Sequence, residues 1–242
     1  MMTKGRALYS FSRGIAAILL ASAVSTTAYA DNSVVVELYT SQGCSSCPAA
    51  DAVLKTLKHR PNVIALSLNV DYWDYLGWKD DLALPGNTTR QRKYAKMMRS
   101  RHVYTPQLMV DGKMDVIGSR RSQVDSAVES FSNDKDSARV LAQVDGNEVK
   151  VAVSPETSEA RDAIIWLVGF DSSIVRNVGG GENQGRSIEY SNVVREWREV
   201  GRWDGRSALE LNLRRPAGEG GLAVIVQEGE VGEILGAKQV SY

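Results

Sequence analysis

The chain has 242 residues and is formally neutral, with 29 lysines and arginines against 29 aspartates and glutamates. This balance gives no electrostatic reason to expect a nucleic acid or an anionic membrane surface as a partner. The length is sufficient for one large domain or for two small domains, each with its own core.

The N-terminus, residues 1–30, has the pattern of a signal peptide. Lys4, Arg6 and Arg13 form a basic start, a short apolar stretch follows, and the small-x-small triplet at 28–30 fits a cleavage site. We therefore expect export, with the mature chain secreted or periplasmic. The apolar stretch is too short to span a bilayer comfortably, so no membrane span is expected after cleavage. An uncleaved anchor is the alternative.

Cys44 and Cys47 are the only cysteines in the chain, and they lie between a strand-like run at 34–39 and a helix-like run at 48–58. A CxxC pair at the start of a helix is the usual arrangement for thiol–disulfide exchange, because the helix N-terminus stabilises a thiolate. A disulfide between Cys44 and Cys47 would close a very short loop and would therefore restrain the unfolded chain little. We predict that Cys44 is the attacking thiolate and that Cys47 resolves the mixed disulfide. A static disulfide or a buried thiol pair is the alternative.

The first half of the chain alternates between strand and helix patterns. Strands are predicted at 34–39, 62–70, 107–110 and 114–117, and helices at 48–58, 88–101 and 120–131. This is the order of thioredoxin-like proteins, which place a cis-proline before the third strand, facing the cysteines. Thr105 and Pro106 occupy that place. We therefore expect an α/β thioredoxin-like domain over 31–134.

The character of the chain changes after a polar, linker-like stretch at 132–137. Short strand candidates follow at 140–144, 149–153, 163–170, 191–197, 209–213, 222–227 and 233–237. Short strands with glycine-rich turns are typical of β-sandwiches. We expect an all-β, sandwich-like C-terminal domain over 138–242.

Longer motifs run through both halves: 37–51, 70–80, 90–94 and 103–107 in the first, and 181–186, 192–194 and 201–203 in the second. In these motifs the chain resembles a family of secreted, thioredoxin-like proteins catalogued as domain-of-unknown-function family 1223. The resemblance implies a fold and export but no settled activity. Ser45-Ser46 replaces the Gly-Pro that separates the cysteines of thioredoxins. Because this dipeptide tunes the redox potential, the direction of exchange stays open.

Glu37 interrupts an otherwise apolar strand, ten residues before Cys47. Thioredoxin-like enzymes often keep a buried carboxylate in that strand, where it relays a proton to the second cysteine. The predicted catalytic residues are therefore Cys44, Cys47 and Glu37, with Thr105 and Pro106 holding the partner's chain beside Cys44. The alternative for Glu37 is a glutamate at an edge or on the surface.

Two further segments have alternative interpretations. Four aromatic side chains lie close together in sequence: Tyr72, Trp73, Tyr75 and Trp78. They form either a lip over the site or packing between the two domains, and the cost of exposing them favours packing. The glycine-rich segment 179–186 lacks the features of a phosphate loop. It is either a flexible connection or a segment that reaches the thiols with Arg186.

The sequence therefore predicts an exported thiol–disulfide oxidoreductase that acts on a protein or small-molecule thiol or disulfide, without a cofactor. A zinc site is not expected, because His59 and His102 are the only histidines. One alternative is a non-enzymatic envelope binding module for a ligand or copper(I), held by the thiolates with Met97, Met98 or Met109. Another is a structural interaction protein with an inert disulfide.

Overall fold

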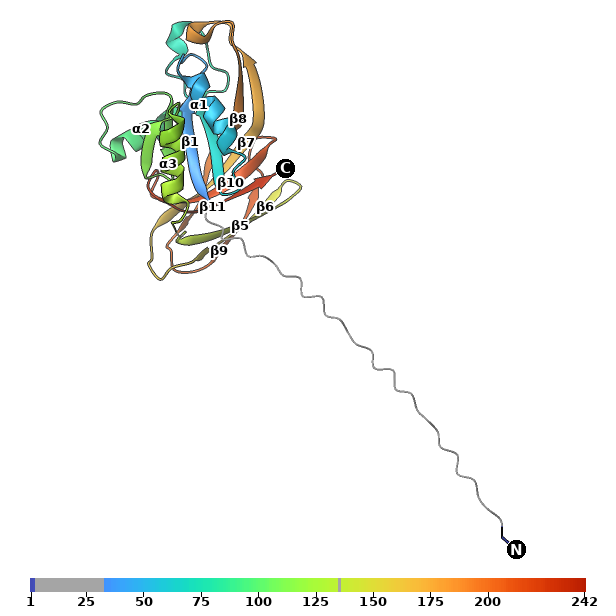
Figure 1. Cartoon of the computed structure of the whole chain (residues 1–242). Helices are drawn as coiled ribbons and strands as arrows, with labels where there is room; N and C mark the ends of the chain where they lie inside the picture. The colour runs from blue at the N-terminus through green and yellow to red at the C-terminus, as the bar shows by residue number, and fades with distance from the viewer. Residues whose placement is uncertain (3–32, 135) are drawn as a thin grey trace.

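The computed structural model describes residues 1–2, 33–134 and 136–242 (Figure 1). The predicted signal peptide, residues 1–30, lies outside the described residues except for its first two. Within the described part of the chain, no helix is long and apolar enough to cross a membrane.

Eight strands form one mixed sheet in the order β11-β10-β7-β8-β2-β1-β3-β4. Their bounds are β1 Val34–Thr40, β2 Val63–Asn69, β3 Gln107–Val110, β4 Met114–Ile117, β7 Ala163–Asn177, β8 Ser187–Trp203, β10 Gly221–Glu228 and β11 Ile234–Ser241. β2 pairs in parallel with β1 on one side and with β8 on the other. The remaining neighbours in this sheet are antiparallel.

A second sheet has three strands in the order β5-β6-β9. These strands are β5 Ala138–Asp145, β6 Glu148–Pro155 and β9 Leu209–Arg214. The α-helices of the described residues are α1 Cys47–Leu57, α2 Pro85–Met97 and α3 Arg121–Phe131. Two short 3-10 turns, η1 Asp74–Leu76 and η2 Gly181–Asn183, lie in the connections. Figure 1 shows the small sheet at the opposite end of the molecule from η2.

The predicted fold class, an α/β thioredoxin-like domain followed by an all-β sandwich-like domain, is wrong. The protein is mostly β, and its main sheet takes strands from both halves of the chain. The reason is that β8, from the second half, pairs with the free edge of β2 at Ser67 and Val193. The two halves therefore share one sheet. The division into 31–134 and 138–242 stays a prediction, and its boundary falls between α3 and β5.

β1 is buried on both of its faces, and the alternation of its side chains assigns them to two cores. Val36 and Leu38 pack on the side of α1, together with Leu54. Val35 and Tyr39 point to the opposite side, where a core formed with β7, β8, β10 and α2 covers them. Because both faces of the strand are buried, its sequence is an apolar run with little alternation.

A third core holds the small sheet against the large one. Val140 of β5 and Val151 of β6 pack with Leu167 of β7 and Val224 of β10. Along β6, side chains alternate between buried and exposed, as expected for a sheet with one face on the core and one face exposed to solvent. This end of the protein is thus a two-layer β structure, and it lies away from the cysteines.

The hairpin predicted from Asp111-Gly112 is confirmed with its predicted bounds, β3 at 107–110 and β4 at 114–117. Asp111 and Gly112 both have positive φ, 54° and 69°. A tight turn of this kind requires left-handed backbone at both central residues, which aspartate tolerates and glycine favours.

Candidate functional site

Cys44 and Cys47 form a disulfide between the end of β1 and the first turn of α1. Two turns in the backbone position the pair: the Cys44 N–H donates to the Ser41 carbonyl at 3.2 Å, and the Cys47 N–H donates to the Cys44 carbonyl at 3.1 Å. Pro48 follows within the first turn of α1. Proline has no backbone N–H, and this is harmless here because the N–H groups of the first turn have no partner within the helix. The sequence therefore fixes the loop at both ends, by tight turns and by a helix start.

The disulfide is covered rather than open to solvent. Cys44 is 1% exposed and Cys47 is fully buried, whereas Ser45 and Ser46 between them are exposed. The Ser46 hydroxyl lies 3.4 Å from the Cys44 sulfur. Two exposed serines thus separate the two buried cysteines in the chain, and one of them contacts the Cys44 sulfur.

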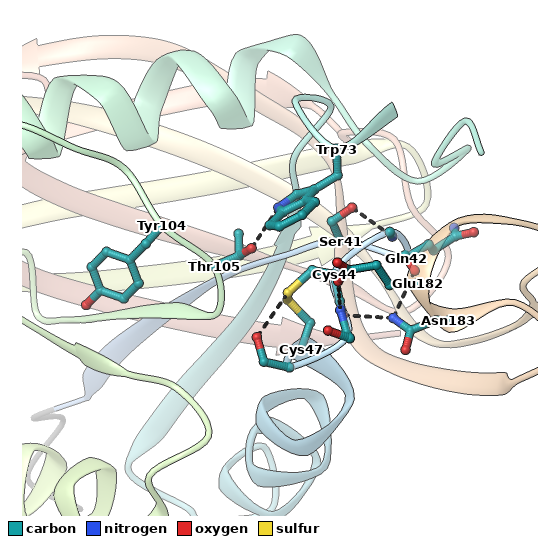
Figure 2. Close-up of a disulfide and its surroundings, with 12 residues drawn as sticks. Ser41, Gln42, Cys44, Cys47, Trp73, Tyr104, Thr105, Glu182 and Asn183 are labelled. Carbon is teal, nitrogen blue, oxygen red and sulfur yellow. Dashed lines mark hydrogen bonds between the residues drawn. A yellow bond between two sulfur atoms is a disulfide. The ribbon is translucent and has the colours of Figure 1, made fainter. Parts of the chain in front are cut away.

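Trp73 connects the cysteine loop to the predicted cis-proline element. Its indole N–H donates to the Thr105 hydroxyl oxygen at 2.8 Å, and its Cβ lies where a side chain on Gly43 would make a close contact of 3.0 Å. The Thr105–Pro106 bond is cis. Figure 2 shows Trp73 and Thr105 on one side of the cysteines and Asn183 on the other. Trp73 therefore joins Thr105 to the cysteine loop, and the catalytic role predicted for Thr105 and Pro106 stays a prediction.

The glycine-rich segment reaches the cysteine loop from the second half of the chain. Asn183, whose side chain is fully buried, donates from its amide to the carbonyl oxygens of Gln42 at 3.0 Å and of Cys44 at 2.8 Å (Figure 2). Glu182 accepts the Ser45 N–H at 2.9 Å. Arg186 supports this arrangement indirectly, because it donates to the Asn183 side-chain oxygen at 2.9 Å.

A buried network of polar side chains around Asp80 holds the cysteine loop at Gln42. Gln42 donates through its backbone and its side chain to Asp80, at 2.9 and 2.8 Å. Asn69, at the end of β2, donates to the same carboxylate at 3.0 Å. Trp78 donates to the Gln42 side-chain oxygen at 2.8 Å. Burial raises the pKa of Asp80, and these hydrogen bonds oppose the rise.

The aromatic segment divides between packing and exposure, and its predicted role as a lip over the site stays a prediction. Trp78 packs inward, against Gly179 and Gly180 of the glycine-rich segment. Tyr75, in contrast, is 77% exposed and stacks on Trp73 with ring centroids 6.3 Å apart. One part of the segment therefore joins the two halves, and the other forms an aromatic surface beside the disulfide.

Asp51 is the residue of this region that sequence reasoning missed. It lies four residues after Cys47 on the buried face of α1 and is 3% exposed. Neither of its carboxyl oxygens has a hydrogen-bond partner. Burial raises the pKa of Asp51 to about 8, the Thr40 hydroxyl opposes the rise, and the charge of Asp80 adds to it. The available signal was a carboxylate at a core-facing position of an otherwise apolar helix face.

Glu37 is buried, but in a different environment. Arg90 donates to its two carboxylate oxygens at 2.7 and 2.8 Å, and the hydroxyls of Tyr39 and Tyr94 donate to it at 2.9 and 2.7 Å. Within the described residues, no hydrogen bond links Glu37 to either cysteine. Its alternation with Val36 and Leu38 places it on the face of β1 opposite α1, so the structure does not bring it together with the thiols.

The methionines named for copper(I) do not gather at the sulfurs. Met109 is buried in the core on the Tyr39 side of the sheet, Met98 packs against the same core, and Met97 is exposed. Among the described residues, no group of three or more histidine, cysteine, aspartate or glutamate side chains is arranged to hold a metal ion.

Comparison with known proteins places the chain in a family without assigning an activity. A family model described as "Protein of unknown function (DUF1223)" matches residues 35–227. The crystal structure of protein AGR_C_4864 from Agrobacterium tumefaciens is similar, with 30% identity, a TM-score of 0.74, and coverage of 86% of this chain and 93% of that one. HBP35 of Porphyromonas gingivalis, at 14% identity and a TM-score of 0.56 over 87% of this chain and 75% of that one, is similar in fold alone. No curated protein matches the chain.

Proposed function

Because the chain belongs to the family of proteins of unknown function DUF1223, whose description names no activity, we propose its function from the site: it is an exported protein that catalyses thiol–disulfide exchange through Cys44 and Cys47. One observation carries the proposal. The only two cysteines form a disulfide at the N-terminus of a helix, where it closes a ring too small to stabilise the fold appreciably.

The helix N-terminus favours this chemistry. Its unpaired N–H groups and its partial positive charge stabilise a thiolate that lies just before the first turn. The Ser46 hydroxyl, 3.4 Å from the Cys44 sulfur, is a further donor for a thiolate at that position. Cys44 precedes α1 and lies beside the exposed serines, whereas Cys47 lies inside the helix. Cys44 is therefore the sulfur that exchanges with a partner, and Cys47 is the resolving sulfur.

Exchange in the reducing direction has two steps. The Cys44 thiolate attacks one sulfur of the partner's disulfide, which breaks that bond and forms a mixed disulfide. Cys47 then attacks the Cys44 sulfur as a thiolate, so that the protein disulfide closes and the partner leaves as a dithiol. The partner is reduced by two electrons and the protein pair is oxidised. In the oxidising direction the same steps run in reverse.

Access to Cys44 requires a local movement, since only 1% of this residue is exposed. Trp73 is the large side chain that lies against Gly43 and Thr105. Its displacement would open a path to the sulfur beside the backbone of Thr105, which is where an extended peptide would pair. The exposed ring of Tyr75 extends the same surface. A partner with an extended, partly apolar segment next to its cysteine fits this surface.

Export is part of the proposal and is supported by the N-terminal pattern. A disulfide persists in a secreted or periplasmic protein, because those compartments are oxidising. The predicted leader would be removed before the protein acts. Fractionation of cells that express the full chain, with mass spectrometry of its N-terminus, tests this directly. A cytoplasmic chain that retains its first thirty residues would contradict it.

Trapping the mixed disulfide tests the chemistry. The reduced Cys47→Ser variant, mixed with oxidised glutathione, is expected to gain one glutathione on Cys44 and to retain it. The reduced wild type is expected to close its own disulfide and release the glutathione. The Cys44→Ser variant serves as the control and is expected to react slowly, because Cys47 lies inside α1 whereas Cys44 lies beside the exposed serines. Equal, slow reaction of both single variants would indicate an inert structural pair.

A further inference from the structure

Three buried polar side chains on α1, β1 and β8 have no hydrogen-bond partner. They are both carboxyl oxygens of Asp51 on α1, the hydroxyl of Thr40 at the end of β1, and the hydroxyl of Tyr190 on β8. Each is buried. Buried polar groups are almost always paired, because an unpaired one weakens the fold. An unpaired carboxyl group about one helical turn after a disulfide cysteine therefore points to a function.

The geometry of α1 directs Asp51 toward Cys47. Residues four apart on a helix lie one above the other on the same face, and the bond from Cα to Cβ is tilted toward the helix N-terminus. Cys47 and Asp51 both belong to the buried face of α1. The carboxyl group of Asp51 thus extends toward the turn that carries the Cys47 sulfur.

We propose that Asp51 holds the proton that moves to and from Cys47 during thiol–disulfide exchange, so that it acts as the general acid when the disulfide opens and as the general base when it closes. This inference rests on the proposed function, and it names the proton-carrying residue of the same site. Glu37, the carboxylate predicted for this role, already accepts four hydrogen bonds on the opposite face of β1.

The opening reaction shows how the proton is used. A partner dithiol, as its thiolate, attacks the Cys44 sulfur, and the electron pair of the Cys44–Cys47 bond goes to Cys47. The Asp51 carboxylic acid gives its proton to the Cys47 sulfur and becomes a carboxylate. The partner's second thiol loses its proton to solvent and attacks the partner sulfur of the mixed disulfide, which releases Cys44 as a thiolate. The partner is oxidised by two electrons, and the protein disulfide is reduced.

Burial and the charge of Asp80 favour the neutral form of Asp51, and the Thr40 hydroxyl opposes them. Thr40 from β1 and Tyr190 from β8 are uncharged at neutral pH, and Asp80 from the loop after η1 is a further carboxyl group. Asp51 belongs to no ion pair in the described part of the chain. Burial first, and the charge of Asp80 second, raise the pKa of Asp51 to about 8. In the disulfide form at pH 7, Asp51 therefore carries the proton that Cys47 needs.

Reduction by dithiothreitol tests the inference without the natural partner. The rate constant is measured from pH 6 to pH 10 and is divided by the concentration of dithiothreitol thiolate. For the wild type this quantity should fall as pH rises through about 8, because the ionised carboxylate has no proton to give. In Asp51→Asn the profile should be flat. At pH 7 the variant should be slower by about 100-fold, the lower end of the range for general acid catalysis.

Asp111→Asn is the matched control. Asp111 is another buried aspartate, and burial raises its pKa to about 6, but it lies beside Val35 at the other end of β1. Asparagine tolerates its positive φ of 54°. This variant should keep the wild-type profile. A folded Asp51→Asn protein, checked by circular dichroism, that also keeps the wild-type profile would overturn the inference.

Infrared spectroscopy gives a second readout that needs no exchange at all. The oxidised wild type should show a carbonyl band of a protonated carboxylic acid that disappears with a midpoint near pH 8, and Asp51→Asn should lack it. If Asp51→Asn does not fold, the wild type alone decides, since a rate profile without a step near pH 8 contradicts the inference. If the rate profile has the step but Cys47→Ser traps no glutathione, the proposed function fails while the proton transfer stands.

Discussion

The side-chain amide of Asn183 donates a 2.8 Å hydrogen bond to the carbonyl oxygen of Cys44, a residue 139 positions earlier in the chain. The same nitrogen also donates to the Gln42 carbonyl. The cysteine loop is therefore held by a residue from the other half of the protein, and the candidate site belongs to both halves. This relationship explains why the glycine-rich segment approaches so closely, with Gly179 and Gly180 packed on Trp78.

Replacing Asn183 with alanine should destabilise the protein and loosen the cysteine loop. The change removes the hydrogen bonds that the Asn183 amide donates to the buried Gln42 and Cys44 carbonyl oxygens, which corresponds to roughly 2 kcal/mol of unfolding free energy. Urea unfolding measures this loss. Glu182→Gln is the control, because Glu182 is at the surface and its replacement should have an effect within about 0.5 kcal/mol. Equal effects of the two changes would show that Asn183 does not hold the loop.

Replacing Glu37 with glutamine should be strongly destabilising. Arg90 is 7% and Glu37 is 1% exposed at the side chain, and the loss of one partner leaves an unpaired buried charge, an effect of about 3–5 kcal/mol. The exposed pair of Lys93 and Glu230 provides the control, since Lys93→Gln should change the unfolding free energy by less than about 1 kcal/mol. Both are measured by urea unfolding at pH 7. A Glu37→Gln protein as stable as Lys93→Gln would contradict this account of the buried pair.

The stability of the Asp51→Asn variant relative to wild type should depend on pH. Burial raises the folded-state pKa of Asp51 to about 8, above its value in the unfolded chain, so between about pH 4 and pH 8 the folded state binds the additional proton. Wild-type unfolding free energy therefore falls through this window because of Asp51, by at most about 1.4 kcal/mol per pH unit. The difference between variant and wild type should grow in favour of the variant from pH 5 to pH 8 and then level off. A difference independent of pH would show that Asp51 is not protonated in the folded state.

Replacing Trp73 with alanine should make the disulfide easier to reach. Trp73 lies against Gly43 at its Cβ and donates to Thr105 from its indole N–H, and removal of the ring should increase severalfold the rate at which a water-soluble phosphine reduces the disulfide. Trp73→Phe retains a ring but loses the hydrogen bond to Thr105, so its rate should lie between those of the wild type and Trp73→Ala. Rates that are equal in all three proteins would show that Trp73 does not cover Cys44.

The secondary structure was largely predictable from local patterns, whereas the arrangement of the strands was not. The apolar run of β2 predicted a strand buried on both faces, and the hairpin of β3 and β4 followed from Asp111-Gly112. The pairing of β2 with β8 uses backbone groups at Ser67 and Val193. Backbone hydrogen bonds have no residue-specific pattern, so the sequence contains no signal that the sheet continues into the second half.

The same limit applies to the candidate site. Cys44, Cys47 and the Thr105–Pro106 element were predicted, because their residue types are distinctive at their spacing. Asn183 was not, because its role depends on a contact across 139 positions. Asp51 had a local signal, its place among Cys47 and Leu54 on the buried face of α1. Glu37, the charged residue of the apolar strand, has the same kind of local signal, but its partner Arg90 lies 53 positions away in sequence.

The redox midpoint of the Cys44–Cys47 pair tests the central claim most directly. The mature protein is equilibrated in graded glutathione buffers, its free thiols are alkylated, and the oxidised fraction is measured by mass spectrometry. A midpoint between about −120 and −270 mV, the range of working redox couples, is the predicted result, and its value would also give the direction of exchange. A disulfide that remains closed well below about −300 mV would be a structural bond and would contradict the account.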